Sequence, residues 1–257
     1  MKEKKDLLPA QRQNLIKDFL IETGFVSIAD LGTQFNVSEM TIRRDLDQLE
    51  RQGFIQRTYG GAVPTEPAFY EMSFKAKYFQ HAEEKQRIGI AAAGLIREGQ
   101  TILLDSGTTT DLIIKNLENI HVTVITNALN IVSEAMKYPE MEVMVAGGML
   151  RKGLNYMMGP QTNDFMKTIR ADVFFLAVEG VDIRAGFTVP DLYNADNKRA
   201  MIKASQRVVV VTDHSKLGRI SSSLIIPLDQ ANLLITGKEA DQGIVEELCE
   251  HIEVMIV

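Results

Sequence analysis

Apolar residues recur at helical spacing in three successive segments near the start of the chain. A first helix is predicted over residues 10–22, with its apolar face formed by Leu15, Ile16, Phe19 and Leu20. Ser27 can cap a second, short helix that ends near Phe35. After a turn, Ser38 can cap a third helix that runs to about Gln52. This order predicts a helix-turn-helix.

The third predicted helix separates apolar from polar side chains. Ile42, Leu46 and Leu49 share one face, which we expect to pack on the first two helices. The opposite face carries Thr41, Arg44, Asp47 and Gln48. In a major groove, arginine can bind guanine O6 and N7, and glutamine can bind adenine. The pattern therefore predicts a DNA-binding face, with Arg43 directed at a phosphate and Ser38 contributing contacts from the helix N-terminus.

The segment after this helix alternates like a short strand and is closed by Gly60 and Gly61, as in a hairpin. Arg57 is the candidate for a basic residue at the tip of such a wing. The alternative is a helical bundle that serves in packing or dimerisation, in which Arg43 and Arg44 are solvated surface charges. We favour the DNA-binding interpretation because turn, caps, apolar face and wing occur in the right order.

Pro64 and Pro67 interrupt the periodicity and indicate a connector. The predicted organisation is a winged helix-turn-helix domain over residues 1–62, a linker over 63–76 and a larger α/β domain over 77–257. In the larger part, apolar strands alternate with helices, which predicts a mostly parallel sheet covered on both faces. The strands are predicted over 101–104, 122–125, 143–146, 173–178, 208–211, 233–235 and 254–257, and the helices over 83–96, 110–117, 128–136, 197–204 and 242–251.

Four of the predicted strands end in small or polar residues. Ligands of such sheets bind at the carboxyl ends of the strands, and hydroxyls, backbone amides and a helix N-terminus suit a phosphate. Ordinary turns also use these residue types, but four strand ends together favour an anion pocket. We expect Lys216 to supply a positive charge and Asp105 or Asp213 to accept sugar hydroxyls. The candidate residues are Asp105, Ser106, Gly107, Thr108, Thr109, Thr126, Asn127, Gly147, Gly148, Asp213 and Lys216.

Composition narrows these interpretations. The chain has 257 residues, of which 45% are hydrophobic and 24% charged, a composition that favours neither a disordered nor a fibrous protein. The net charge is −6, and residues 1–64 balance nine basic against nine acidic side chains, so DNA binding cannot rest on overall basicity. The single Cys249, the lack of a signal-peptide pattern and the shortness of the apolar runs indicate a cytoplasmic protein without membrane spans.

Metal or cofactor chemistry is not indicated by the sequence. His81, His121, His214 and His251 are scattered without metal-ligand spacing, so we expect them to lie at the surface or at helix ends and expect no metal site. We also expect no cofactor and no catalytic residues.

The quoted residues resemble the DeoR family of bacterial repressors over nearly the whole chain. In the first part the resemblance rests on residues 37–46, Leu49, Glu50, Gly53 and residues 57–62; in the second, it rests on residues 105–109, 124–128, 146–148, 198–202 and 213–218. It implies a winged helix that binds operator DNA and a sensor domain that resembles sugar-phosphate isomerases in fold. It adds Lys198 to the effector candidates. Residues 177–180 and 193–196 depart from the family pattern, which bears on the identity of the effector.

Three functions follow from these observations. The favoured one is a repressor of a carbohydrate operon that a phosphorylated sugar or related intermediate releases from DNA. We expect a homo-oligomer, either a dimer or a tetramer, because one recognition helix has a limited interface. The alternatives are a sugar-phosphate isomerase, supported by the carboxylates Asp105, Glu179, Asp182 and Asp213, and a constitutive DNA-binding protein whose larger domain oligomerises.

Overall fold

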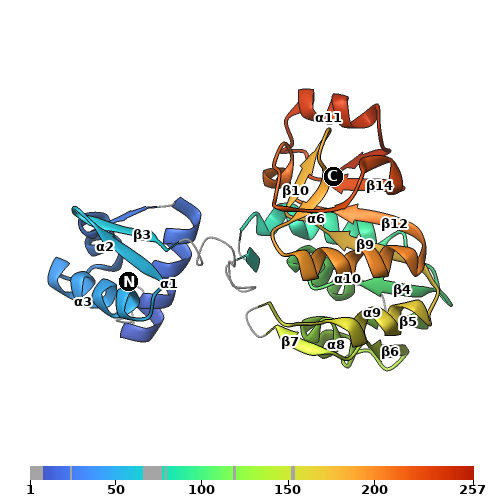
Figure 1. Cartoon of the computed structure of the whole chain (residues 1–257), viewed down its shortest axis with the longest axis horizontal. Helices are drawn as coiled ribbons and strands as arrows, with labels where there is room; N and C mark the ends of the chain where they lie inside the picture. Colours follow the sequence, from blue (N-terminus) through green and yellow to red (C-terminus); the bar gives the residue numbers. More distant parts are fainter. Residues whose placement is uncertain (1–7, 24, 66–76, 79, 118–119, 152–153) are drawn as a thin grey trace, which may run out of the picture. The chain divides into compact units, whose positions relative to one another are not determined.

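The chain divides into two compact units, residues 1–76 and 77–257 (Figure 1). The computed structural model describes residues 8–23, 25–65, 77–78, 80–117, 120–151 and 154–257. Most of the predicted linker, from residue 66 to residue 76, lies outside the described residues.

The first unit combines three helices with a small antiparallel sheet. Its elements are α1 (Pro9–Thr23), β1 (Val26–Ser27), α2 (Ile28–Phe35), α3 (Glu39–Arg51), β2 (Ile55–Thr58) and β3 (Gly61–Pro64). The predicted helix-turn-helix and hairpin are confirmed, and Ile42, Leu46 and Leu49 of α3 are fully buried. The short strand β1, which pairs with β3, was not predicted. Pro64 is the last residue of β3 and pairs with Ile55 of β2, so the expectation that Pro64 belongs to the connector was wrong.

A seven-stranded parallel sheet forms the second unit. Its strands, in spatial order, are β15 (Val254–Ile256), β14 (Leu233–Thr236), β12 (Ser205–Val211), β9 (Ala171–Ala177), β4 (Thr101–Leu104), β5 (Val122–Thr126) and β6 (Met141–Val145). From β4 the chain adds strands outward on one side, and from β9 it adds them on the other. The order of strands therefore reverses between β4 and β9, where parallel α/β sheets form ligand crevices.

The central strands are apolar throughout because both faces of the sheet are buried. In β12, Val208 and Val210 join one hydrophobic cluster, whereas Val209 and Val211 join the cluster on the other face. Successive side chains of a strand point to opposite faces, so an uninterrupted apolar run fills both clusters.

Helices cover both faces of this sheet. One cluster contains apolar residues of α6 (Ala82–Ala93), α7 (Thr108–Asn116) and α8 (Leu129–Ala135). The other contains residues of α9 (Pro160–Lys167), α10 (Leu192–Lys203) and α11 (Gln242–Cys249). Among the described residues, no helix has both the length and the apolar character needed to cross a membrane.

Several elements differ from the prediction. Helix α6 ends at Ala93, with Gly94 as its C-cap, instead of reaching Ile96. Helix α10 begins five residues earlier than expected, because Asp191 caps it by accepting from the amides of Tyr193 and Asn194. The prediction also missed α9, two 3₁₀ turns, the hairpin of β7 (Met149–Arg151) with β8 (Tyr156–Met158), and the antiparallel sheet of β10 (Gly180–Asp182), β11 (Gly186–Val189) and β13 (Ser223–Ile226).

Candidate functional site

A buried ion pair fixes α3 against α1. The Arg12 Nε donates to Asp45 Oδ2 at 2.5 Å, and Gln13 Nε2 donates to the other carboxylate oxygen at 3.1 Å. Both side chains of the ion pair are almost fully buried. The ion pair and the buried apolar side of α3 together fix the orientation of this helix, because an unpaired buried Asp45 would be costly. The opposite face of α3 is therefore exposed.

The exposed face of α3 begins at its N-cap. Ser38 Oγ accepts from the Thr41 amide at 3.2 Å and lies 2.9 Å from the Thr41 hydroxyl. Arg43 is exposed and lies 3.6 Å from Glu39, one turn earlier. Arg44 is also exposed and, within the described part of the chain, has no hydrogen-bonding or ionic partner. Its guanidinium is available to a ligand from outside.

Two further candidates on this side are tied to the rest of the unit. Gln48 is exposed, and its Oε1 accepts from Gln13 Nε2 at 3.0 Å, which leaves its own amide group free to donate. Arg57 lies within β2 and not at the tip of the hairpin, where the sequence pattern had placed it. Its guanidinium bonds Asp47 at 2.5 Å and the Arg43 carbonyl at 3.4 Å. The tip carries Tyr59, which is fully exposed, and Gly60 with a positive φ of 83°.

At the strand-order reversal of the second unit, Asp105 follows β4 and forms a buried ion pair with Lys198 of α10. Lys198 Nζ also donates to the Ala177 carbonyl at 2.9 Å. The Asp105 carboxylate accepts from the amides of Ala177 at 3.0 Å and Gly107 at 3.2 Å, and from the Thr110 hydroxyl at 3.2 Å. Protein donors thus engage both of its oxygens, so the geometry does not present a free carboxylate for sugar hydroxyls.

The loop between β4 and α7 packs tightly against the end of β9. A Cβ added to Gly107 would lie 2.4 Å from the Ala177 Cβ, so this close approach requires glycine. Gly107 is the N-cap of α7 and has no side chain to bond the first amides of the helix. Ser106 is partly exposed beside this N-terminus, and Thr108 and Thr109 are buried within it. Such an N-terminus attracts anions.

The end of β5 adds a buried amide group. Thr126 donates to the Leu104 carbonyl at 2.7 Å and accepts from the Ala128 amide at 3.0 Å, so its hydroxyl is satisfied internally. Asn127 and Asn197 both donate to the Met157 carbonyl, at 2.8 and 3.1 Å. The Oδ1 atoms of both side chains are buried without a donor among the described residues. Asn197 was missed because its partner lies on a strand that the sequence pattern did not reveal.

After β6, Gly147 and Gly148 are exposed in a loop. The Gly147 carbonyl accepts from the Thr162 hydroxyl at 2.8 Å. Gly148 has a positive φ of 155°, and a Cβ there would lie 2.3 Å from the Thr162 Oγ1. Gly148 therefore permits the close approach of α9 to the strand end, whereas a Cβ at Gly147 would meet no atom within 4 Å.

A second network of charges lies at the ends of β9 and β12. Glu179 pairs with Lys77 and, at 3.3 Å, with Lys216. Burial acts to raise the pKa of Glu179, but the two lysines outweigh it and lower the pKa from 4.5 to about 2. Lys216, which was expected to supply a charge for phosphate, is therefore paired with a residue of the segment that departs from the family pattern.

The remaining members of this network are Asp213 and Lys85. Their charged atoms are 3.6 Å apart, and both side chains are buried. Burial lowers the pKa of Lys85, and Asp213 opposes that effect. Asp213 also accepts from the Ser215 amide at 3.1 Å. Like Asp105, it is already engaged by protein donors.

The structure brings together two histidines that the sequence pattern left scattered. His81, at the start of α6, and His214, after β12, stack edge to face with ring centres 4.7 Å apart. Glu84 of α6 bonds the His214 amide and ring Nδ1, each at 2.7 Å. Candidate ligand atoms of His81, Glu84 and His214 all lie within 4.8 Å of one another. Residue spacing could not indicate this cluster, because 133 residues separate the two histidines.

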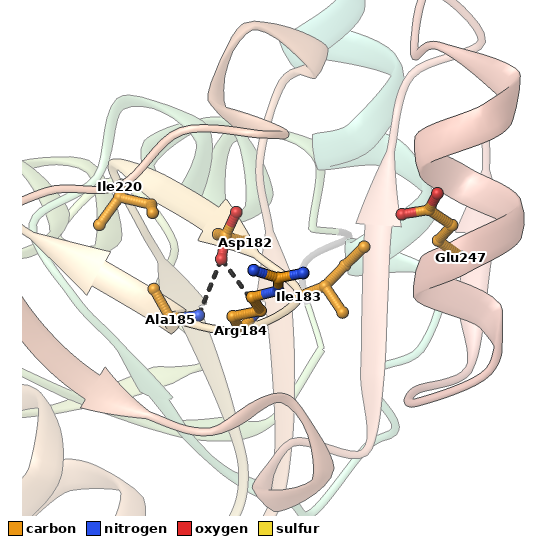
Figure 2. Close-up of a pocket in the computed structure, with 6 residues that line it drawn as sticks. All are labelled: Asp182, Ile183, Arg184, Ala185, Ile220 and Glu247. Carbon is orange, nitrogen blue, oxygen red and sulfur yellow. Dashed lines mark hydrogen bonds between the residues drawn. The ribbon is translucent and has the colours of Figure 1, made fainter.

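A surface pocket of about 670 Å³ lies elsewhere in the second unit, between the β10–β11 turn and α11 (Figure 2). It contains none of the predicted effector residues. Its Asp182 carboxylate is bonded to the amides of Arg184 and Ala185, at 2.9 and 2.8 Å, as the dashed lines show. The Asp182 carboxylate thus stabilises the β10–β11 turn. We therefore place the candidate effector site at the strand ends and not in this pocket.

Two family models match the chain and together account for both units. A DeoR-like helix-turn-helix domain matches residues 12–68, and a DeoR C-terminal sensor domain matches residues 80–238. The second match alone covers more than half of the chain.

Whole-length relatives agree with these matches. The HTH-type transcriptional regulator GlpR of Haloferax volcanii is 32% identical, over 94% of this chain and 95% of that protein. The glycerol-3-phosphate regulon repressor of Escherichia coli is also 32% identical, over 94% of this chain and 96% of that protein.

Among solved structures, ribose 5-phosphate isomerase A of Methanocaldococcus jannaschii overlaps with a TM-score of 0.40 at 19% identity, over 54% of this chain and 55% of that chain. That overlap is too low to decide the expected resemblance to isomerases. The family matches and the whole-length relatives do decide the identity: this chain belongs to the DeoR family of DNA-binding transcriptional regulators.

Proposed function

We propose that this protein is a repressor of a carbohydrate-metabolism operon and that a phosphorylated sugar or related intermediate releases it from operator DNA. The observation that carries the DNA-binding part is the exposed Arg44, unpaired within the described chain, on the face of α3 opposite the buried Ile42, Leu46 and Leu49. The printed names of the relatives, among them a glycerol-3-phosphate regulon repressor and a putative aga operon repressor, support the kind of operon.

On the DNA side, Arg44 is the proposed base-contacting residue and Arg43 the proposed phosphate contact. Gln48 can donate to adenine N7, because Gln13 engages its oxygen and leaves its amide group free. Ser38 and Thr41 present the first turn of α3 to the DNA backbone. Arg57, whose Nη1 bonds Asp47, is proposed to support α3 from the wing.

On the effector side, the phosphate is proposed to bind at the N-terminus of α7, with Ser106, Gly107, Thr108 and Thr109 around it. Lys216 contributes its charge once the anion replaces part of its contact with Glu179. The unsatisfied Oδ1 atoms of Asn127 and Asn197 suit sugar hydroxyls, because buried acceptors require donors. Asp105, Lys198, Thr126, Gly147, Gly148 and Asp213 hold the strand ends in place, a supporting role in this proposal.

The relatives are named as regulators, and we propose that this chain is not an isomerase. A general base works best with a pKa near the working pH. Glu179, with a pKa of about 2, is a weak base at neutral pH, and Asp105 is engaged by Lys198 and by backbone amides. We further propose a cytoplasmic homo-oligomer, since paired half-sites of operator DNA call for paired winged helices.

The test is a panel of phosphorylated and unphosphorylated sugars in thermal-shift and mobility-shift assays on the full chain. A ligand of the native state raises the Tm by mass action. We expect at least one phosphorylated compound, but not its unphosphorylated counterpart, to raise the Tm and to release operator DNA. Conversion of any panel member into its isomer, or a panel that leaves Tm and DNA binding unchanged, contradicts the proposal.

A further inference from the structure

We propose that His81, Glu84 and His214 form a binding site for a divalent transition-metal ion of the zinc class. Two imidazole nitrogens and a carboxylate oxygen are the donor set that borderline cations such as Zn²⁺ and Co²⁺ prefer. The three candidate ligand atoms lie within 4.8 Å of one another, so small side-chain movements bring them to a common ion.

The local backbone explains why these groups converge. His81 is the N-cap of α6 and Glu84 is three residues later, so both lie on the same side of the first turn. His214 reaches this turn from the opposite direction, at the start of the 3₁₀ turn His214–Lys216 that follows β12. Two elements that are distant in sequence thus contribute to one cluster.

Glu84 is the fixed member of the cluster. Its side chain is almost fully buried; its Oε1 accepts from the His214 amide, and its Oε2 lies 2.7 Å from the ring Nδ1 of His214. A Cβ at Gly237 would lie 2.3 Å from Glu84 Oε1, so the glycine leaves room for the carboxylate. Because its position is held by these contacts, the carboxylate is already oriented toward the two imidazoles.

His81 adopts a conformation that its role in the helix does not require. Its φ of 50° is in the left-handed region, and its side chain makes no capping hydrogen bond to α6. Instead, its ring packs edge to face with the ring of His214, and the residue remains exposed. Strained residues of this kind concentrate at functional sites. A metal ion would use the imidazole that the backbone directs to this place.

Charge is compatible with a bound cation. Lys85, the neighbouring cation on α6, is paired with Asp213 and donates to the Lys77 carbonyl at 2.7 Å. With neutral imidazoles, the cluster carries the single negative charge of Glu84. Three protein ligands leave one position of a tetrahedral ion for water or another ligand.

The experiment titrates Co²⁺, then Zn²⁺ in competition, into the full chain carrying Cys249→Ser, so that the exposed thiol cannot bind the ion. No sugar or DNA is present, so the result does not depend on the proposed effector. We expect one Co²⁺ per chain, with the absorption of a tetrahedral nitrogen- and oxygen-ligated ion. His81→Gly, which fits the positive φ and removes the ligand, should weaken binding at least about tenfold.

His121→Gly is the matched control, because His121 is another exposed histidine of the same unit, and it should bind Co²⁺ as the parent does. His214→Ala should reproduce the loss seen with His81→Gly. The proposal is overturned if the parent binds no Co²⁺, if His81→Gly binds as tightly as the parent, or if the control loses as much affinity as His81→Gly.

Discussion

The two units present their proposed ligand-binding residues in opposite ways. On α3, Arg44 is exposed and without a partner within the described chain, while the stabilising contacts lie on the buried side at Asp45. At the strand ends of the larger unit, the charged residues pair with one another, as Asp105 does with Lys198 and Glu179 with Lys216. Under the proposed function, DNA meets an open surface, whereas an effector exchanges contacts that already exist. A site of the second kind couples ligand binding to local rearrangement.

The largest expected effect concerns the buried pair at the strand-order reversal. Lys198→Met leaves Asp105 buried and unpaired, which costs on the order of 3–5 kcal/mol of unfolding free energy. Hydrogen exchange of peptides from β9, followed in urea, measures this loss of unfolding free energy in the second unit. Lys167→Met, which removes an exposed pair with Asp164, is the control and should cost less than about 1 kcal/mol. Equal losses would break the contrast between paired and open charges.

The next effect is pH dependence from Glu179. Its pKa falls from 4.5 to about 2 in the folded state, so its stabilisation is complete above pH 4.5 and is lost as the pH falls toward 2. The lowering corresponds to roughly 3 kcal/mol at neutral pH. Glu179→Gln should flatten the stability profile of the sensor unit in that window, measured by hydrogen exchange. Asp164→Asn, at the exposed pair, should leave the profile unchanged.

A smaller effect separates two glycines of the predicted site. Gly107→Ala places a Cβ 2.4 Å from Ala177, and such overpacking costs about 1–3 kcal/mol. Gly147→Ala meets no atom within 4 Å and should be close to neutral. Urea unfolding of the two variants compares them directly. If Gly147→Ala lowered the unfolding free energy more than Gly107→Ala, the close packing of the β4–α7 loop would not explain the glycine at position 107.

The smallest expected effect concerns the contact between Glu179 and Lys216. If Glu179 competes with the effector for Lys216, then Glu179→Gln should tighten binding of the phosphorylated ligand by up to about tenfold, about 1.4 kcal/mol. Isothermal titration with the ligand found in the panel measures it. Weaker binding by this variant would instead make Glu179 a contact of the effector.

Sequence patterns predicted what depends on local periodicity. The strands β9 and β12 are buried on both faces and therefore appear as uninterrupted apolar runs. Helix α3 is amphipathic, with one buried apolar face, and therefore shows helical periodicity. The strands β10, β11 and β13 are short and were not predicted. Because Arg44 lies opposite the apolar seam of α3, its exposure also follows from the sequence pattern alone.

The partners of the charged residues could not be predicted. Lys198 and Asp105 are 93 residues apart, and Glu179 and Lys77 are 102 apart. Such pairings arise from the order of strands in the sheet, which a single sequence does not encode locally. The same holds for His81 and His214, and for Arg57, whose alternating segment suggested a wing tip but whose guanidinium faces Asp47.

Operator binding by Arg44→Ala is the most direct test of the central claim that α3 presents its exposed face to base edges. Mobility shifts should compare the operator with an unrelated duplex for the parent, Arg44→Ala and the control Arg51→Ala, which removes an exposed arginine in the last turn of α3. Loss of a bidentate base contact costs about 1–3 kcal/mol of discrimination. We predict that Arg44→Ala alone loses the preference for the operator while keeping its thermal response to the effector. Undiminished operator preference in Arg44→Ala would contradict the account.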